Sequence, residues 1–190
     1  MKTILLLTCI NLFFLNSFSQ SVVSCTIATA LGNIHIELYL DKAPVTVENF
    51  LKYVDNQLYD GTNFYRVCTP ENEKERTVKI EVIQGGDVPE AKQFEPIPIE
   101  TTQQTGITHQ NGTLSMARDT PNSATSSFFI CIGNQPELDF AGKRNPDGQG
   151  FAAFGRVTKG MNVVKKIQAE KENGQYLIEP VVIRSIRRID

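Results

Sequence analysis

Three polar residues interrupt apolar stretches of the sequence and are the first candidates for chemistry. Arg66 lies in Phe-Tyr-Arg-Val, Gln84 lies in Val-Ile-Gln-Gly-Gly, and Arg118 follows Ser-Met-Ala. An arginine in a strand usually only points its charge to solvent. If one face of the protein is a groove, Arg66 becomes a fixed hydrogen-bond donor beside apolar walls, and the paired glycines Gly85 and Gly86 let a peptide backbone come close.

The residue patterns of other common reactions do not occur. The two histidines are far apart in the sequence: alternation places His35 on the outside of a strand, and His109 falls in a polar turn, so neither is favoured as a general base. The stretch Gly112–Met116 lacks the second glycine of a nucleophile elbow, and no Gly-rich phosphate loop or acidic metal cluster is present. Hydrolysis, phosphoryl transfer and metal chemistry are disfavoured, and we expect no cofactor.

The composition is that of one ordinary globular domain. The chain has 190 residues, of which 41% are hydrophobic and 21% charged, enough to bury a core without a metal or a disulfide framework. Nineteen Lys and Arg against 21 Asp and Glu give a net charge of −2, so there is no basic excess to neutralise phosphates. We expect no nucleic-acid partner.

The N-terminal segment has the features of a signal peptide. Lys2 precedes an uncharged, mostly apolar run from Ile4 to Phe18, and the run ends in the small-residue pattern Ser17-Phe18-Ser19 before Gln20. The run has 15 residues, whereas a spanning helix needs about 20, so a retained membrane anchor is the less favoured alternative. We expect a signal peptide over 1–19 and one exported domain over 20–190, located in the periplasm or cell envelope.

The cysteines do not form a zinc or redox pattern. Cys9 lies in the predicted signal peptide, and Cys25, Cys68 and Cys131 have no Cys-x-x-Cys spacing. The residues before Cys25 also resemble a lipidation box, but its place in the alternating run Val23–Thr29 favours a strand. One disulfide among the three is possible in an oxidising compartment, and the sequence does not select which.

Short strands separated by turns make up most of the domain. Alternation over Val23–Thr29 and Ile34–Tyr39 predicts a hairpin, and apolar residues at helical spacing predict helices over Thr46–Asn56 and Met161–Ala169. The other predicted strands are Asn63–Cys68, Thr77–Ile83, Gly112–Ala117, Phe128–Ile132, Ala152–Val157 and Val181–Ile189. This order favours an antiparallel barrel closed at its ends by helices, because closure removes exposed sheet edges.

One segment is unusually polar. Five of the six residues in Glu71–Arg76 are charged, and the segment lies between two predicted strands. We interpret it as a solvated loop inserted between them.

Taken in order, several motifs resemble those of the cyclophilins. They are Phe-Tyr-Arg-Val at 64–67, Gln-Gly-Gly-Asp at 84–87, Gly-Thr-Leu-Ser-Met-Ala-Arg at 112–118, the stretch 121–130 ending in Phe-Phe-Ile, and Phe-Gly-Arg-Val at 154–157. The stretch 43–50 is similar to the first helix of that family. The resemblance implies a mainly β fold, namely a closed eight-stranded antiparallel β-barrel capped by two α-helices, and peptidyl-prolyl cis-trans isomerase activity.

The resemblance also implies a catalytic role for Arg66, which matches the family's catalytic arginine. Rotation about an X–Pro bond has a barrier of about 18–20 kcal/mol because of amide resonance. A donor that hydrogen-bonds the imide nitrogen as it becomes pyramidal stabilises the twisted transition state. The guanidinium stays protonated, so Arg66 is a permanent donor.

A substrate groove follows from the same resemblance. Phe129 matches the pocket aromatic, and Gln84 matches a residue that contacts the arginine or the peptide backbone. The further substrate-binding positions are the apolar walls Val82 and Leu138, the segment Ala117 and Arg118 along which a peptide lies extended, and Phe151 in the last wall.

Four groove positions depart from the family pattern. Glu81, Ser127 and Glu137 replace an aromatic, a glutamine and an aromatic, and Phe151 replaces a histidine. These changes bear on substrate affinity more than on the arginine. The family's aromatic at the position of Glu137 contacts cyclosporin, so we expect weak cyclosporin binding.

Two interpretations of Glu81 remain open. The segment Cys68–Thr77 is longer than the family's link, so its extra residues can shift the register and let Ile80 or Val82 supply the missing wall. Alternatively, Glu81 faces the pocket and pairs with Arg66. We favour the first.

The resulting hypothesis is an isomerase acting on exported proteins. Its partners would be proline-containing peptides and unfolded or folding proteins, and nothing in the sequence requires more than a monomer. The alternative is a proline-peptide-binding or chaperone-like module of low turnover that uses the same groove.

Overall fold

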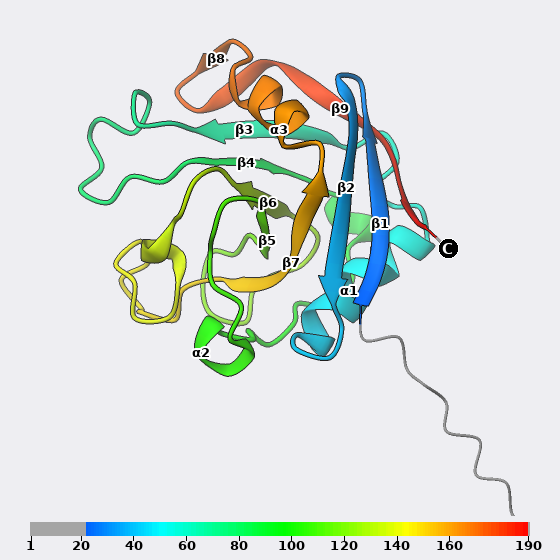
Figure 1. Ribbon diagram of the computed structural model, residues 1–190, viewed down its shortest axis with the longest axis horizontal. Helices are drawn as coiled ribbons and strands as arrows, with labels where there is room; N and C mark the ends of the chain where they lie inside the picture. Colours follow the sequence, from blue (N-terminus) through cyan, green and yellow to red (C-terminus); the bar gives the residue numbers. More distant parts are fainter. Residues whose placement is uncertain (1–21, 190) are drawn as a thin grey trace, which may run out of the picture.

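The computed structural model describes residues 22–189, which form a closed β-barrel (Figure 1). The strands are β1 (Val22–Thr29), β2 (Gly32–Tyr39), β3 (Asn63–Cys68), β4 (Val82–Gly85), β5 (Thr113–Met116), β6 (Phe128–Cys131), β7 (Ala152–Lys159), β8 (Glu172–Asn173) and β9 (Tyr176–Arg188). Their order is β1-β2-β7-β5-β6-β4-β3-β9, and every pair is antiparallel. The barrel closes because β9 also pairs with β1, whereas β8 pairs only with β9. The predicted eight-stranded antiparallel barrel is confirmed.

The helices lie around the barrel. They are α1 (Pro44–Asp55), α2 (Thr102–Thr105) and α3 (Met161–Gln168), with single 3₁₀ turns η1 (Glu90–Lys92) and η2 (Pro136–Leu138). Pro44 occupies the first turn of α1, where its missing N–H has no helical partner to lose. The two predicted helices are present, and α2 is an additional helix of four residues. None of the helices within 22–189 is long and apolar enough to cross a membrane.

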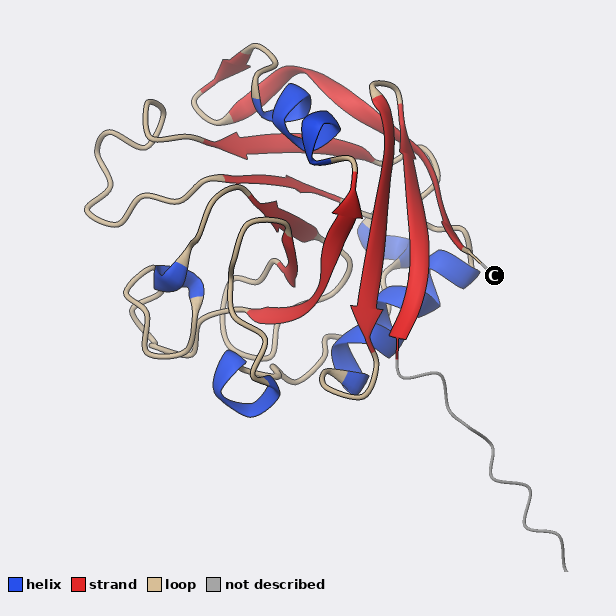
Figure 2. Cartoon of the chain, viewed as in Figure 1, coloured by secondary structure: helices blue, strands red, loops and turns tan. Residues whose placement is uncertain are grey.

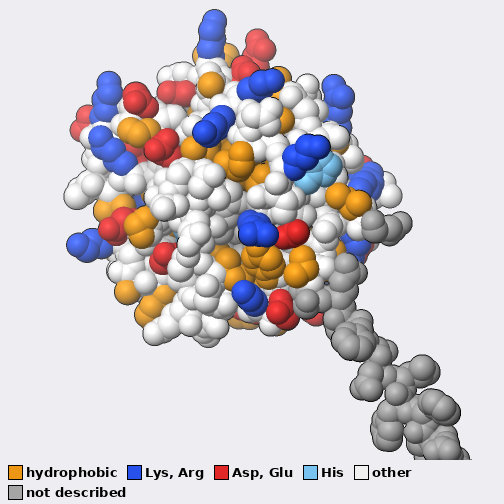
Figure 3. All heavy atoms as spheres, in the orientation of Figure 1, with side chains coloured by type: hydrophobic (Ala, Val, Ile, Leu, Met, Phe, Trp, Pro, Cys, Tyr) orange, Lys and Arg blue, Asp and Glu red, His pale blue; other side chains and the backbone are white. Residues whose placement is uncertain are grey.

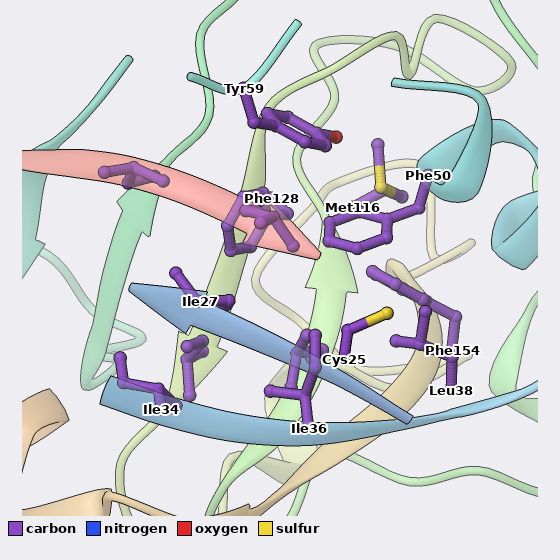
Figure 4. Close-up of a cluster of buried hydrophobic side chains, with 14 of the residues drawn as sticks. Cys25, Ile27, Ile34, Ile36, Leu38, Phe50, Tyr59, Met116, Phe128 and Phe154 are labelled. Carbon is purple, nitrogen blue, oxygen red and sulfur yellow. The ribbon is translucent and has the colours of Figure 1, made fainter. Parts of the chain in front are cut away.

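The barrel interior is filled by side chains of the strands and of α1. Phe50 of α1 reaches into the core, where its ring centroid lies 5.4 Å from that of Phe128 and 5.2 Å from that of Phe154 (Figure 4). Ile27 and Ile36, from β1 and β2, complete this part of the core and are fully or almost fully buried. On the outer surface, acidic and basic side chains are interspersed over the face shown in Figure 3.

The predicted strand Thr77–Ile83 is wrong over most of its length. The strand begins only at Val82, and the residues before it belong to the long β3–β4 loop (Figure 2). The physical reason is that the Ile80 N–H donates to the carboxylate of Glu73, at 2.8 Å, rather than to a neighbouring strand. The last strand starts earlier than predicted, at Tyr176 instead of Val181.

The interpretation of Glu71–Arg76 as a solvated loop is wrong at one residue. Glu71, Lys74, Glu75 and Arg76 are exposed, but Glu73 is 1% exposed. Its carboxylate accepts hydrogen bonds at 2.6 and 2.9 Å from Arg144, so the loop is anchored by a buried ion pair.

The three described cysteines are free and buried. Cys25 lies within β1, as the strand interpretation predicts, and it faces the barrel core. Cys68 and Cys131 lie on either side of Val82, two strands apart, which is about 9.6 Å at the usual strand spacing and too far for a disulfide. Burial raises the pKa of the Cys68 thiol to about 11. The predicted signal peptide and Cys9 lie outside the described residues.

The paired glycines after Gln84 serve packing rather than access for a peptide backbone, which corrects the expectation from the sequence. A Cβ atom on Gly85 would lie 2.6 Å from the Asn63 carbonyl oxygen, and one on Gly86 would lie 2.6 Å from the Phe128 ring. Both positions are therefore closed by the protein itself.

We predict that Gly86→Ala destabilises the protein much more than Gly148→Ala. Both glycines have positive φ, +76° and +67°, but nothing lies within 4 Å of a Cβ on Gly148. Backbone strain alone costs about 1 kcal/mol, and overpacking against Phe128 adds about 2 kcal/mol. Urea unfolding of both variants measures the difference, and equal losses would contradict the packing role of Gly86.

Candidate active site

A β-bulge in β3 turns Arg66 to the outside of the barrel. In the pairing of β3 with β4, the register shifts between Phe64 and Arg66, which leaves Tyr65 as the extra residue. The pairing of β3 with β9 is irregular at the same place, where residues 177–180 of β9 have no partner on β3. Phe64 and Val67 are fully buried in the barrel core, whereas Tyr65 and Arg66 line an outer cavity. Without the bulge, Phe64 and Arg66 would share one face, because side chains alternate along a strand.

The outer cavity has an apolar floor that is separate from the barrel core. This floor consists of side chains on the outer faces of β3, β4 and β6 and on two loops: Cys68, Ile80, Val82, Phe129, Cys131 and Leu138, with Ala117 and Phe151 packed against them. The cavity has a volume of about 550 Å³, within the size range of small-ligand sites.

All eight residues that the sequence analysis assigned to the site line this one cavity. They are Arg66, Val82, Gln84, Ala117, Arg118, Phe129, Leu138 and Phe151. They come from β3, β4, β6 and the segments after β5 and before β7, so barrel closure brings together residues up to 85 positions apart.

The Arg66 guanidinium is held by two side-chain amides. Its Nη1–H donates to Oε1 of Gln84 at 2.8 Å, and its Nε–H and Nη2–H donate to Oε1 of Gln175 at 3.0 and 2.6 Å. The Gln84 amide donates in turn to the Tyr65 hydroxyl at 2.7 Å. A guanidinium has five N–H groups, so within the described residues one on Nη1 and one on Nη2 remain for a ligand.

Neither amide neutralises the charge of Arg66. An amide oxygen orients a guanidinium through hydrogen bonds but carries no formal charge, unlike a carboxylate. Arg66 therefore presents a full positive charge beside the apolar floor. This is the arrangement that a site needs to stabilise electron density developing on a bound group.

Two other arginines at the cavity, Arg118 and Arg144, are engaged by carboxylates, whereas the side chain of Arg76 is exposed to solvent. Arg118 donates to both carboxylate oxygens of Asp147 at 2.8 Å and to the Gly150 carbonyl at 2.6 and 2.8 Å. Its guanidinium also lies 5.3 Å from the Phe151 ring. The Arg118 side chain therefore fixes the loop that carries Phe151 and presents little free charge.

Arg144 is held by Glu73, whose side chain is fully buried. Burial alone would raise the pKa of Glu73. The hydrogen bonds from Arg144 and from the Ile80 N–H outweigh burial, and the net pKa lies below its usual range. Glu73 is therefore ionised at neutral pH.

The Phe129 ring is supported from behind by a buried histidine. The two rings are stacked, with centroids 5.9 Å apart, and Phe151 meets Phe129 edge-on at 5.3 Å. His109 is 1% exposed although the sequence around it is polar. The physical reason is that its Nδ1 lies 2.7 Å from Asp139 and its Nε2 lies 2.9 Å from the Ser115 hydroxyl, so its polar atoms are satisfied without water.

The Ser115, His109 and Asp139 side chains resemble a hydrolase triad in their distances, but they cannot act as one. Ser115 and His109 are 0% and 1% exposed and lie behind Phe129, so no substrate carbonyl reaches the hydroxyl. Their role is to hold the floor of the cavity.

Three of the residues that differ from the family pattern, Glu81, Ser127 and Glu137, lie in different surroundings. Ile80 and Val82 line the cavity and Glu81 is not among its lining residues, which agrees with the first interpretation of Glu81. Ser127 lines the wall beside Tyr65, with the two hydroxyls 3.5 Å apart. Glu137 is half-buried in η2 and accepts a hydrogen bond from the Lys143 N–H at 2.8 Å.

The cavity lining includes one amide without a partner, and no metal-binding cluster occurs among the described residues. Asn145 lines the cavity, but its Nδ2 atom is buried, and no acceptor for this atom occurs among the described residues. Across 22–189, no three His, Cys, Asp or Glu side chains are grouped so that they could hold a metal ion.

Comparison with known proteins agrees with this geometry. Residues 24–188 match the family model described as cyclophilin type peptidyl-prolyl cis-trans isomerase. The chain belongs to this family. It is 38% identical over 167 residues to an isomerase of Streptomyces antibioticus, covering 84% of this chain and 94% of that protein. It is 37% identical over 175 residues to peptidyl-prolyl cis-trans isomerase B of Escherichia coli, covering 85% and 96%. This cyclophilin is thus a peptidyl-prolyl cis-trans isomerase.

The fold comparison gives the same architecture. A cyclophilin of Cryptosporidium parvum superposes with a TM-score of 0.72 at 22% identity, covering 89% of this chain and 98% of that one. A second structure of the Cryptosporidium protein was determined in the presence of the dipeptide Ala-Pro.

Sequence reasoning missed three residues of the site. Gln175 contacts the guanidinium directly, and Glu73 and Arg144 form the ion pair beside it. Gln175 lies in a hairpin turn and Glu73 in a charged segment, where polar residues are ordinary. The one available signal is the length of the β3–β4 connection, which is greater than a short turn requires.

Proposed function

We propose that this cyclophilin accelerates X–Pro rotation by a hydrogen bond from Arg66 to the prolyl imide nitrogen. The nitrogen lone pair is delocalised into the carbonyl in the planar cis and trans states, and it becomes localised as the bond twists. A donor held beside the nitrogen therefore binds the twisted state better than either planar state. Only such differential binding lowers the barrier.

One observation carries this proposal: Arg66 keeps its full charge and two free N–H groups while two amides hold it at an apolar cavity. The floor formed by Phe129, Val82 and Leu138 suits a proline ring. Rotation forms no covalent bond with the enzyme, so these groups suffice for the reaction.

We predict that Arg66→Ala lowers kcat by about a hundredfold or more, the usual effect of removing a transition-state donor. Catalysis is measured by exchange NMR on short Xaa-Pro peptides with residues 20–190, and amide spectra verify the fold. Arg184→Ala, which removes an exposed arginine of β9, is the control and should retain wild-type rates. An Arg66→Ala variant with undiminished kcat would contradict the mechanism.

The alternative function is a proline-peptide-binding module of low turnover. It is favoured by Ser127 and Glu137, which stand where the family has a glutamine and an aromatic. The same experiment separates the two functions, because a binding module broadens the peptide signals by association but shows no cis-trans exchange cross-peaks.

We further propose that the protein is exported, that it acts as a monomer, and that its substrates are exported proteins with X–Pro bonds. The support is the N-terminal pattern, an apolar run preceded by Lys2 and ending in a small-residue pattern. We predict that the full chain, expressed in a Gram-negative host, is recovered from the periplasm with a mass that begins at Gln20. A diacylated form beginning at Cys25 would instead indicate a lipid anchor, and a dimeric native mass would exclude the monomer.

Weak cyclosporin binding is also proposed, because Glu137 offers a carboxylate where an aromatic ring would stack. We predict that Glu137→Trp tightens cyclosporin binding at least about tenfold, since a buried aromatic contact dominates such interfaces. Titration calorimetry measures both proteins, with Glu179→Trp on the exposed face of β9 as control. Tight binding by the wild type would refute the role assigned to Glu137.

A further inference from the structure

The side chain that holds Arg66 is itself held by the charged loop between β3 and β4. Gln175 Nε2–H donates to Oε1 of Glu73 at 3.2 Å, while Gln175 Oε1 accepts from Arg66. Glu73 also accepts two hydrogen bonds from Arg144, one at each carboxylate oxygen. The four side chains thus form one continuous chain of hydrogen bonds that ends at the proposed catalytic guanidinium.

The Gln175 amide lies between the Arg66 guanidinium and the Glu73 carboxylate, and these two groups allow it only one orientation. A guanidinium only donates and a carboxylate only accepts, so the amide oxygen must face Arg66 and the amide nitrogen must face Glu73. A 180° flip would set donor against donor and acceptor against acceptor. Glu73 therefore determines which atom Gln175 presents to Arg66.

The backbone of Gln175 is held in a conformation that does not suit its residue type. Gly174 and Gln175 form the two-residue loop between β8 and β9, with φ values of 59° and 79°. Such loops favour glycine at the second position, because a Cβ atom there is strained. A strained residue that the surrounding structure retains points to a role for its side chain.

These hydrogen bonds orient the Arg66 guanidinium without neutralising its charge. Glu73 forms a buried ion pair with Arg144, so the pair is neutral as a whole. Between that pair and Arg66 stands an uncharged amide. A carboxylate placed directly on Arg66 would also orient it but would neutralise the charge that the reaction uses.

We propose that Gln175 and Glu73 are positioning residues that hold the Arg66 guanidinium in one orientation for catalysis. This inference rests on the mechanism proposed above for Arg66. The charged loop, by contributing Glu73, then belongs to the catalytic apparatus, although most of its other charged side chains are exposed to solvent.

The decisive variant is Gln175→Gly, because it removes the amide while relieving backbone strain. We expect stability equal to or above that of the wild type, a kcat about tenfold lower and a KM within about twofold, since misplacement affects the transition state more than binding. Glu73→Gln should lower kcat in the same direction. Glu71→Gln and Glu75→Gln make the same chemical change at exposed positions of the same loop and should match the wild type.

A second readout does not depend on activity. The Arg66 Nε–H signal, identified by its loss in Arg66→Lys, should exchange with water about tenfold faster in Gln175→Gly, because a hydrogen bond to a charged group is lost. The controls should leave it unchanged. This signal tests positioning directly in the free protein.

The outcomes separate the two proposals. Faster exchange together with a lower kcat supports positioning. Unchanged exchange and unchanged kcat in a folded Gln175→Gly variant would overturn it, as would a loss of stability with no specific effect on kcat. If the wild type shows no catalysis, the isomerase mechanism proposed for Arg66 fails. The positioning role in catalysis then fails too, even if the Arg66 Nε–H signal responds to Gln175→Gly. If Glu73→Gln does not fold, Gln175→Gly decides alone.

Discussion

The filled interior of the barrel is the constraint on which the site depends. Eight strands enclose a space that their own side chains occupy, here with the ring of Phe50 among them. A ligand must therefore bind outside, where strands alone offer only a convex wall. The hollow is made by loops that rise beside the strands, the charged β3–β4 loop on one side and the loop from η2 to β7 on the other. The Glu73–Arg144 ion pair joins these two loops.

Within that hollow, hydrogen-bond partners decide which arginine is available for chemistry. Arg118 and Arg144 each form an ion pair with a carboxylate, donate further hydrogen bonds to backbone carbonyls, and serve to fix loops. Among residues 22–189, the partners of the Arg66 side chain are amides only, so its charge is not paired with a carboxylate. The same residue type thus has structural and chemical roles within one cavity, and the difference lies in the neighbours rather than in the arginine itself.

Residue patterns predicted the barrel, whereas most residues of the cavity were predicted only by the resemblance to the cyclophilin motifs. Alternation marks the strands, and Arg66 and Gln84 stand out because they interrupt apolar runs. What the sequence could not predict depends on contacts between distant segments. The bulge at Tyr65 is decided by pairing with two other strands, and nothing local distinguishes Glu73 or Gln175 from polar residues of ordinary loops. A charged residue in a loop is exposed to solvent only when it has no buried partner of opposite charge.

Closure of the barrel joins the two ends of the described chain. β1 pairs with β9, and Cys25 lies opposite Arg188, so the seam links residues that are 163 positions apart. Contacts of such long range form late, because the chain between them must be ordered first. Until the last strand has emerged from synthesis, β1 has one unpaired edge, and an unpaired edge is a template for association with other chains. A protein of a family that assists folding therefore has a slow and exposed step in its own folding, at the seam where its first and last strands meet.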